Sequence, residues 1–343
     1  MSIQTFIVSR DDRVYEAFPD VTLTADKTKM IAVYLTCNSH LERGHTRIMM
    51  TESVDRGRSW SPPHPFTELT ETEGLTYNCP RISTLPDGRL AVICDKWVAE
   101  GVTAVYVWFS ADNGTTWSAP KKTPATGIVP DCYRVLSCGR HIISTHEENQ
   151  NTKHLEQSLW YSDDGGLTWS EKVTIASDER YHLCEGNILE LSDETLVCFL
   201  RENSMLGIDC LKAFSYDGGA HWQGLVHTAI PACHRPVAGF LKNGNILMTY
   251  RFLQGGGRGF GHNTQNFMCA YFDEESAACQ TREAFRCAIL PLDHDRNPII
   301  TDLGYSGWVE FEDGELYAVN YIIDDAPKAH IRGYSFRKED IVL

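Results

Sequence analysis

Ser162-Asp163-Asp164-Gly165-Gly166-Leu167-Thr168-Trp169 has the pattern Ser-x-Asp-x-Gly-x-x-Trp, which occurs again over residues 53–60, 110–117 and 215–222. Asp and Gly favour a tight turn, because the carboxylate can accept hydrogen bonds from nearby backbone N–H groups and glycine tolerates a positive φ. The Trp ring then buries apolar surface against the turn's neighbours. Four copies, separated by 52–57 residues, indicate a repeated supersecondary unit in which this box is structural rather than catalytic.

A second repeat runs out of phase with the boxes. Short polar turns interrupt pairs of apolar, β-rich runs, and several of them have the Asp-Gly or Asn-Gly sequence of tight hairpins. The six turns are Asp26-Lys27, Asp87-Gly88, Cys138-Gly139, Asp193-Glu194, Asn243-Gly244 and Asp313-Gly314. Six turns, each opening a unit of about four short strands, predict an all-β chain folded as a six-bladed β-propeller.

The two ends of the chain are predicted to share the sixth blade. Three clear strands follow Thr301, so the N-terminal run over residues 5–9 would supply the fourth and close the ring. Blade five has only a degenerate Asp273-Glu274-Glu275 in place of a box. Residues 255–261 are rich in glycine and predict a loop of blade five, with a lid over a site as the alternative. No linker divides the sequence, so residues 1–343 are expected to form one domain.

Composition and charge limit the possible partners. The chain has 31 Lys and Arg against 46 Asp and Glu, a formal charge of −15, which argues against nucleic acid as a partner. No apolar run is long enough to span a membrane, and the N-terminus lacks a signal-peptide pattern. The twelve cysteines form no CxxC pairs. We therefore expect a reduced, cytoplasmic setting with no metal site and no cofactor.

The six turns also align the strands that line the central channel. Positions eight residues before each turn are Phe18, Cys79, Pro130, Glu185, Arg235 and Tyr305. Positions eight residues after a turn, where the second strand returns to the same end, are Asp95, His146, Arg201, Arg251 and Tyr321. Buried charges are costly unless they are paired or used. Any one of them could be a structural salt bridge, but the ring of polar residues predicts a ligand site at one mouth of the channel.

With Ser-x-Asp-x-Gly-x-x-Trp boxes in a chain of six predicted blades, the sequence resembles the sialidase (neuraminidase) superfamily. That family pairs a Tyr nucleophile with a Glu, holds the substrate carboxylate with three Arg, and uses an Asp as acid/base. Tyr305 in Gly304-Tyr305-Ser306 matches the nucleophile's context. Glu185 in Cys184-Glu185-Gly186-Asn187, followed by Arg201 in Leu200-Arg201-Glu202-Asn203, matches the Glu and the second Arg. Arg251, or otherwise Arg235, matches the third.

Two positions depart from the family pattern. The first blade opens with Ala17-Phe18-Pro19, where the family has an Arg. The loop over residues 38–42 contains no Asp, so His40 or Glu42 would have to serve as the acid. The charge missing from the first blade could come from elsewhere in the chain, and the candidates are Arg13, Arg81 and Arg134.

The resemblance implies an exo-acting glycoside hydrolase for an anionic, carboxylate-bearing sugar. A neutral Tyr is not repelled by such a substrate, and a neighbouring Glu can take its proton. Arg suits bidentate binding of a carboxylate. His146 could act as acid/base or bind a hydroxyl. The alternatives are a uronic-acid lyase, a glycosidase for another sugar, and a carbohydrate-binding propeller without activity; only the enzymes require Glu185 and Tyr305 to lie within hydrogen-bond reach.

Overall fold

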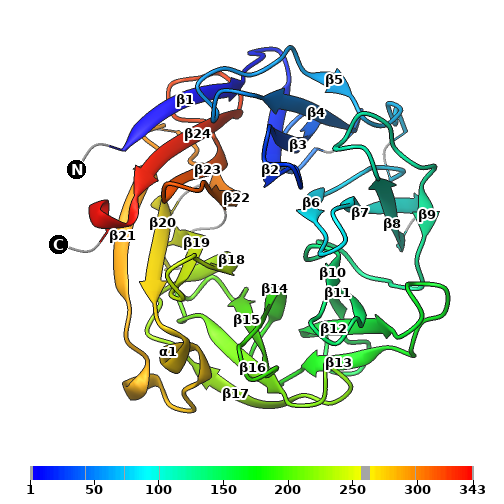
Figure 1. Ribbon diagram of the computed structural model, residues 1–343, viewed down its shortest axis with the longest axis vertical. Coiled ribbons are helices and arrows are strands. Elements are labelled where there is room, and N and C mark those ends of the chain that lie inside the picture. Colours follow the sequence, from blue (N-terminus) through cyan, green and yellow to red (C-terminus); the bar gives the residue numbers. More distant parts are fainter. Residues whose placement is uncertain are drawn as a thin grey trace.

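Six small antiparallel sheets are arranged as a ring around a central channel (Figure 1). The computed structural model describes residues 3–42, 44–72, 74–99, 101–255, 263–297 and 299–341. Each sheet has four strands, and the strand order within each confirms the six-bladed β-propeller predicted from the turns. Most of the glycine-rich stretch over residues 255–261 falls outside the described residues, so the loop and lid predictions for it are not addressed.

The blades follow one another along the chain. Blade one contains β2 (Tyr15–Leu23), β3 (Met30–Cys37), β4 (Arg47–Ser53) and β5 (His64–Pro65). Blade two contains β6 (Arg81–Thr84), β7 (Leu90–Ala99), β8 (Val102–Ser110) and β9 (Lys121–Lys122). Blade three contains β10 (Arg134–Val135), β11 (His141–Glu148), β12 (Leu155–Ser162) and β13 (Val173–Ala176).

The second half of the ring is built the same way. Blade four contains β14 (Leu183–Glu190), β15 (Leu196–Glu202), β16 (Leu211–Ser215) and β17 (Gln223–His227). Blade five contains β18 (Cys233–Phe240), β19 (Ile246–Leu253), β20 (Gln265–Phe272) and β21 (Ala288–His294). Blade six contains β22 (Leu303–Glu310), β23 (Glu315–Ile322), β24 (His330–Arg337) and, from the other end of the chain, β1 (Gln4–Ser9).

Pairing of β1 with β24 closes the ring, as predicted. Gln4 lies opposite Ser335 and Ile7 opposite Arg332 in an antiparallel ladder. The β1 arrow lies along β24 at the outer edge of the ring, near both chain ends (Figure 1). Without β1 the outer edge of β24 would present unpaired backbone groups.

The boxes form turns held by their own Asp and Ser side chains. The Asp164 carboxylate accepts hydrogen bonds from the backbone N–H of Thr168 at 2.8 Å and from its hydroxyl at 2.6 Å, and Ser162 Oγ accepts from the N–H of Gly166 at 2.9 Å. The Trp169 ring is only half-buried and lies 6.3 Å from the ring of Tyr133, so it covers the turn less fully than the sequence suggested.

Blade five replaces the box with a short helix. Asp273 caps α1 (Glu274–Ala278) by accepting from the N–H of Ser276 at 2.8 Å. Two 3₁₀ turns follow later in the chain, over Arg282–Ala284 and Lys338–Asp340. Within the described ranges, no helix is long and apolar enough to cross a bilayer.

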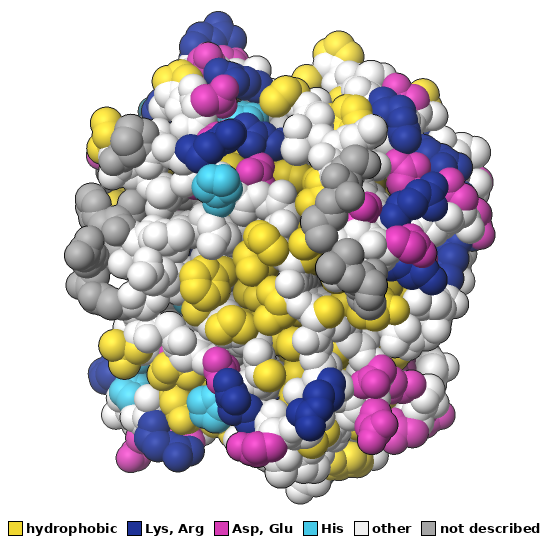
Figure 2. All heavy atoms as spheres, turned by 90° about the vertical axis from the view of Figure 1, so that its left-hand side faces the viewer, with side chains coloured by type: hydrophobic (Ala, Val, Ile, Leu, Met, Phe, Trp, Pro, Cys, Tyr) yellow, Lys and Arg dark blue, Asp and Glu magenta, His cyan; other side chains and the backbone are white. Residues whose placement is uncertain are grey.

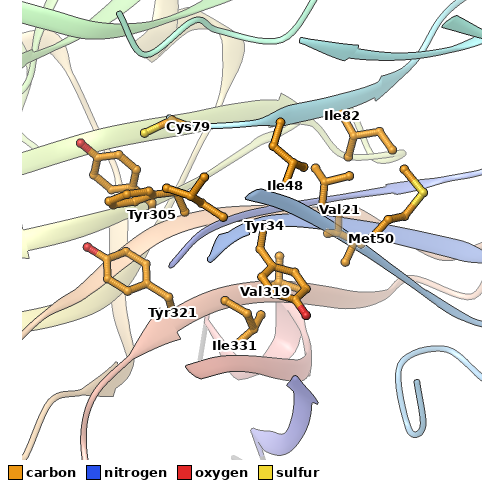
Figure 3. Packing of buried hydrophobic residues seen from close by; sticks show 14 of the residues in the cluster. Val21, Tyr34, Ile48, Met50, Cys79, Ile82, Tyr305, Val319, Tyr321 and Ile331 are labelled. Carbon is orange, nitrogen blue, oxygen red and sulfur yellow. The ribbon is translucent and has the colours of Figure 1, made fainter. Parts of the chain in front are cut away.

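Apolar side chains fill the spaces between neighbouring blades. One cluster combines Val21 and Ile48 of blade one with Ile82 of blade two and Val319 of blade six (Figure 3). Figure 2 shows the outer side of the ring that lies on the left of Figure 1, where hydrophobic side chains gather near the middle and charged ones surround them. All twelve cysteines are free.

Candidate active site

Tyr305 and Glu185 are in contact across the channel. The Tyr305 hydroxyl, on β22, donates a hydrogen bond to Oε1 of Glu185, on β14. Arg201, on β15, donates from Nη1 to the same Oε1 at 2.7 Å and to the Tyr305 oxygen at 3.3 Å. No partner for Glu185 Oε2 is found among the described residues. Side chains from blades four and six therefore form one hydrogen-bonded group.

β-Bulges in the innermost strands present these side chains. The ladder skips two residues between Cys184 and Asn187, and Glu185 in that gap has a φ of 49°. Phe18 and Arg235 lie in equivalent gaps of β2 and β18, with φ of 56° and 53°. A positive φ is uncommon for residues other than glycine and concentrates at functional sites. In blades one, four and five the bulge thus turns one side chain toward the centre of the ring.

Blade six has its bulge one residue farther from the turn. The gap there spans Gly304 and Tyr305, and Gly304 has a φ of 113°. A Cβ added at Gly304 would lie 2.3 Å from Cβ of Arg251, so only glycine leaves room for that side chain to pass. Counting from the turn aligned Tyr305 with Glu185, but the displaced bulge gives the two residues different backbone conformations.

Two further guanidinium groups flank the Tyr305 ring. The Cζ atoms of Arg251 and Arg235 lie 5.2 Å and 5.6 Å from its centroid. Arg251 donates to the carbonyl of Leu303 at 3.2 Å, and Arg235 donates from Nη2 to the carbonyl of Pro130 at 3.0 Å. Among the described residues Arg235 Nη1 has no partner, although the residue is only 1% exposed.

A buried carboxylate that the sequence analysis did not single out completes the group. Asp302 accepts hydrogen bonds from the hydroxyls of Tyr15 and Tyr321 and lies 2.8 Å from His40 Nδ1. Its Oδ1 is 3.9 Å from Arg251 Nη1. Asp302 directly precedes the apolar start of β22. A single charged residue next to a buried strand is the feature of the sequence that could have identified it as a site residue.

The electrostatics keep the proton on Tyr305. Burial disfavours the charged form of Glu185, but the charge and hydrogen bond of Arg201 outweigh it and lower the pKa of this carboxyl to about 2. Burial, together with the neighbouring Glu185 charge, raises the pKa of Tyr305 well above its ordinary value. At neutral pH the pair is therefore a phenol that donates to a carboxylate.

His146 contacts the backbone of Glu185 rather than its carboxylate. Its Nδ1 accepts a hydrogen bond from the Glu185 backbone N–H at 3.3 Å. Burial lowers the pKa of His146 to about 4, with Arg201 and Arg235 acting in the same direction and Glu185 opposing them. The imidazole is neutral at physiological pH, and this hydrogen bond helps to hold Glu185 in its bulge conformation.

Phe18 occupies the position where the resemblance expects an arginine. Its ring lies 5.0 Å from that of Tyr305, 5.3 Å from that of Tyr321 and 5.5 Å from that of His40. Figure 3 shows Tyr305 and Tyr321 side by side with their hydroxyls pointing the same way. An aromatic cluster therefore closes the blade-one side of the site.

The remaining candidates, Glu42 and Asp95, make no hydrogen bond to Tyr305 or Glu185 among the described residues. Glu42 is exposed in the loop that carries His40. The buried carboxylate of Asp95 accepts from Asn78 at 3.0 Å and from the backbone N–H of Val129 at 3.1 Å, and so joins blades two and three.

The three arginines considered as replacements for the first-blade charge each have an acidic partner. Arg13 is exposed beside Asp11. Arg81 is buried 3.2 Å from Asp20 and donates to the carbonyl of Ser306 at 2.8 Å. Arg134 lies 3.4 Å from Asp131. None of them is seen to contact Tyr305 or Glu185 among the described residues.

Comparisons with known proteins agree with this architecture. A family model described as "BNR repeat-like domain" matches residues 68–258. A protein of unknown function from Dyadobacter fermentans DSM 18053 has a TM-score of 0.79 at 19% identity, covering 98% of this chain and 99% of that one. The Hadza microbial sialidase Hz136 has a TM-score of 0.75 at 16% identity, covering 98% and 69%.

A third similar structure carries a sugar ligand. Trypanosoma rangeli sialidase in complex with sialic acid has a TM-score of 0.67 at 14% identity, covering 97% of this chain and 59% of that one. This chain thus spans little more than half of the trypanosomal protein's length. These identities establish a shared fold, and the family model covers more than half of the 343 residues. The chain therefore belongs to the BNR repeat-like domain family and has the six-bladed propeller fold of the sialidases.

Proposed function

We propose that this protein is an exo-acting glycoside hydrolase for a sugar that bears a carboxylate. The observation that carries the proposal is the buried Tyr305–Glu185 hydrogen bond, surrounded by Arg201, Arg235 and Arg251. Three guanidinium groups against the carboxylates of Glu185 and Asp302 leave an excess of positive charge, which favours an anionic ligand. The similar structures include sialidases, one of them holding sialic acid.

In the proposed reaction Tyr305 is the nucleophile and Glu185 is its base. The phenolic proton moves to Glu185, the Tyr305 oxygen forms a bond to the anomeric carbon, and the glycosidic C–O bond breaks. Water then attacks the anomeric carbon, the bond to Tyr305 breaks, and the phenolate regains its proton from Glu185. The arginines would hold the carboxylate of the sugar throughout.

His40 is the proposed acid for the leaving group. Its Nδ1 lies 2.8 Å from the Asp302 carboxylate, which fixes the orientation of the ring and leaves Nε2 to face the leaving group. His40 would give a proton to the leaving oxygen and recover one from the attacking water. The alternative acid from the same loop, Glu42, has an exposed side chain.

A panel of fluorogenic sialosides, uronides and neutral glycosides tests the proposal. We expect turnover of an acidic glycoside by the native protein and none by Tyr305→Phe. Release of an unsaturated, ultraviolet-absorbing sugar would instead identify a lyase. Binding of acidic sugars without turnover of any panel member would contradict the hydrolase and identify a binding protein.

A further inference from the structure

An open groove of about 1180 Å³ lies between the outer part of blade one and strand β1 of blade six. Its lining includes Ile7, Ser9, Glu16, Tyr34, Arg47 and Trp60. Neither Tyr305 nor Glu185 lines it. In Figure 3 the Tyr34 hydroxyl points away from the hydroxyls of Tyr305 and Tyr321, which separates this groove from the candidate active site.

A row of polar side chains crosses the floor of the groove. Glu16 lies opposite Thr36, and Thr36 lies opposite Arg47, on the adjacent strands β2, β3 and β4. Directly opposed residues of antiparallel strands project to the same face of a sheet. The row therefore places one carboxylate, one hydroxyl and one guanidinium side by side on the face of blade one that borders the groove.

The two charged members of the row have unused hydrogen-bonding capacity. Glu16 is only 3% exposed; its Oε1 accepts from Ser9 Oγ at 2.8 Å, but no partner for Oε2 is found among the described residues. The Nε atom of Arg47 is likewise buried without a described partner. Burial raises the pKa of Glu16 to about 7, and hydrogen bonding from Ser9 and from the backbone of Ile331 only partly offsets it. An unpaired buried polar group costs free energy unless a ligand uses it.

The fold itself does not require a carboxylate at this position. Glu16 occupies the place two residues before the bulge of β2, and the equivalent residues in blades four and five are Leu183 and Cys233. Both are buried hydrophobic residues. Glu16 is therefore a polar residue at a position where blades four and five pack an apolar side chain, whereas blade six has the buried carboxylate of Asp302 there.

We propose that this groove is a second carbohydrate-binding site, which takes an uncharged sugar. Hydroxyls on different parts of one sugar can donate to Glu16 Oε2 and accept from Arg47 Nε, whose strands lie two spacings, or about 10 Å, apart. Trp60 with Pro62 and Pro63 provides an apolar wall for the C–H face of the ring.

The charges in the groove favour an uncharged ligand over an anionic one. Glu16 would repel a carboxylate or sulfate. Arg13 and Arg10 already pair with Asp11 and Asp12 at 2.7 Å and 2.8 Å. The groove thus takes an uncharged sugar, whereas the proposed active site takes an anionic one. Binding in the groove does not depend on hydrolysis.

Saturation-transfer NMR with glucose, galactose, N-acetylglucosamine and lactose tests the proposal. We expect at least one of these sugars to bind the native protein and the Tyr305→Phe variant alike. Glu16→Leu copies blade four, so it should keep or raise the thermal midpoint while weakening sugar binding by about tenfold or more. Arg47→Met, at a half-buried position, should weaken binding in the same way.

Three results would overturn the proposal. One is the absence of signal for all four sugars with the native protein. Another is undiminished binding to both Glu16→Leu and Arg47→Met. The third is loss of binding in Tyr305→Phe, which would place the neutral sugar in the central channel. Turnover of acidic glycosides is measured separately on the same variants, so failure of this site and failure of the proposed hydrolase are distinguishable.

Discussion

Tyr305 donates its hydrogen bond to Oε1 of Glu185, the same oxygen that accepts from Arg201 Nη1 at 2.7 Å. This one carboxylate oxygen thus accepts a hydrogen bond from a phenol of blade six and another from a guanidinium of blade four. Because Arg201 holds the negative charge of Glu185 in place, the phenol has a fixed acceptor for its proton. Five expectations follow from this arrangement and from the ring that supports it.

Tyr305→Phe removes the proposed nucleophile and little else. We expect kcat on an acidic glycoside to fall by about 10³-fold or more, while KM and the thermal midpoint change little, since the ring and its packing are retained. Tyr250→Phe is the matched control: Tyr250 is fully buried, its hydroxyl has no described partner, and its loss should leave turnover intact. Full activity of Tyr305→Phe would rule out the tyrosine mechanism.

Glu185 should make the stability of the folded protein depend on pH in the acidic range. Its pKa is lowered from 4.5 to about 2, so its contribution is fully present above about pH 4.5 and is lost as the pH falls toward 2. The shift corresponds to roughly 3 kcal/mol. Thermal midpoints measured from pH 6 to pH 3 should fall more steeply for the native protein than for Glu185→Gln. Parallel curves would show that Glu185 is not held as a carboxylate in the folded state.

Arg235→Met should weaken the binding of acidic sugars selectively. The unpartnered Nη1 of Arg235 is available to a ligand carboxylate, and a hydrogen bond to a charged group contributes about 1.5–3 kcal/mol. We expect Kd for a sialic acid or uronic acid to rise by about 10- to 100-fold in calorimetric titrations. Arg180→Met, at an exposed arginine paired with Asp178, is the control and should bind as the native protein does. Equal losses for both variants would point to a non-specific charge effect.

His40→Ala separates the two candidates for the acid. Loss of the acid should lower the rate of hydrolysis of substrates with poor leaving groups by about 10²- to 10⁴-fold. An activated aryl leaving group needs little protonation, so the rate for aryl glycosides should fall far less. Glu42→Ala should behave as the native protein on both. The reverse pattern, with Glu42→Ala impaired, would transfer the role to Glu42.

Deleting residues 1–9 should destabilise the whole ring. The deletion removes β1 and leaves the outer edge of β24 unpaired. We expect a lower thermal midpoint, a single unfolding transition and a greater tendency to aggregate, monitored by calorimetry and light scattering. A thermal midpoint equal to that of the native protein would show that blade six is stable with three strands.

The sequence allowed the blades to be predicted because each turn is a local structure. Gly88, Gly244 and Gly314 all have positive φ at the predicted hairpin positions, and a hairpin is specified by a few adjacent residues. The Tyr305–Glu185 contact followed from the family resemblance and from one strand register repeated around the ring.

The rest of the site depends on contacts that the sequence does not specify. Asp302 was missed because its partners, Tyr15, His40 and Tyr321, come from three separate segments. Asp95 has the register of a channel residue, yet its carboxylate binds Asn78 and Val129 between blades. Which buried charge faces a ligand and which joins two blades is decided by side-chain packing between distant parts of the chain.

The pairing of β1 with β24 also sets the order of events during synthesis. Strand β1 is made before the other strands of the ring but belongs to the last blade, so it stays without its partner until more than 300 further residues have been added. At about 5–20 residues per second, that interval lasts roughly 15–65 s. Tyr305, on β22, reaches Glu185 only near the end of this interval. The nascent chain therefore carries an unpaired β1 and an incomplete site until blade six has been made, and blade six completes both.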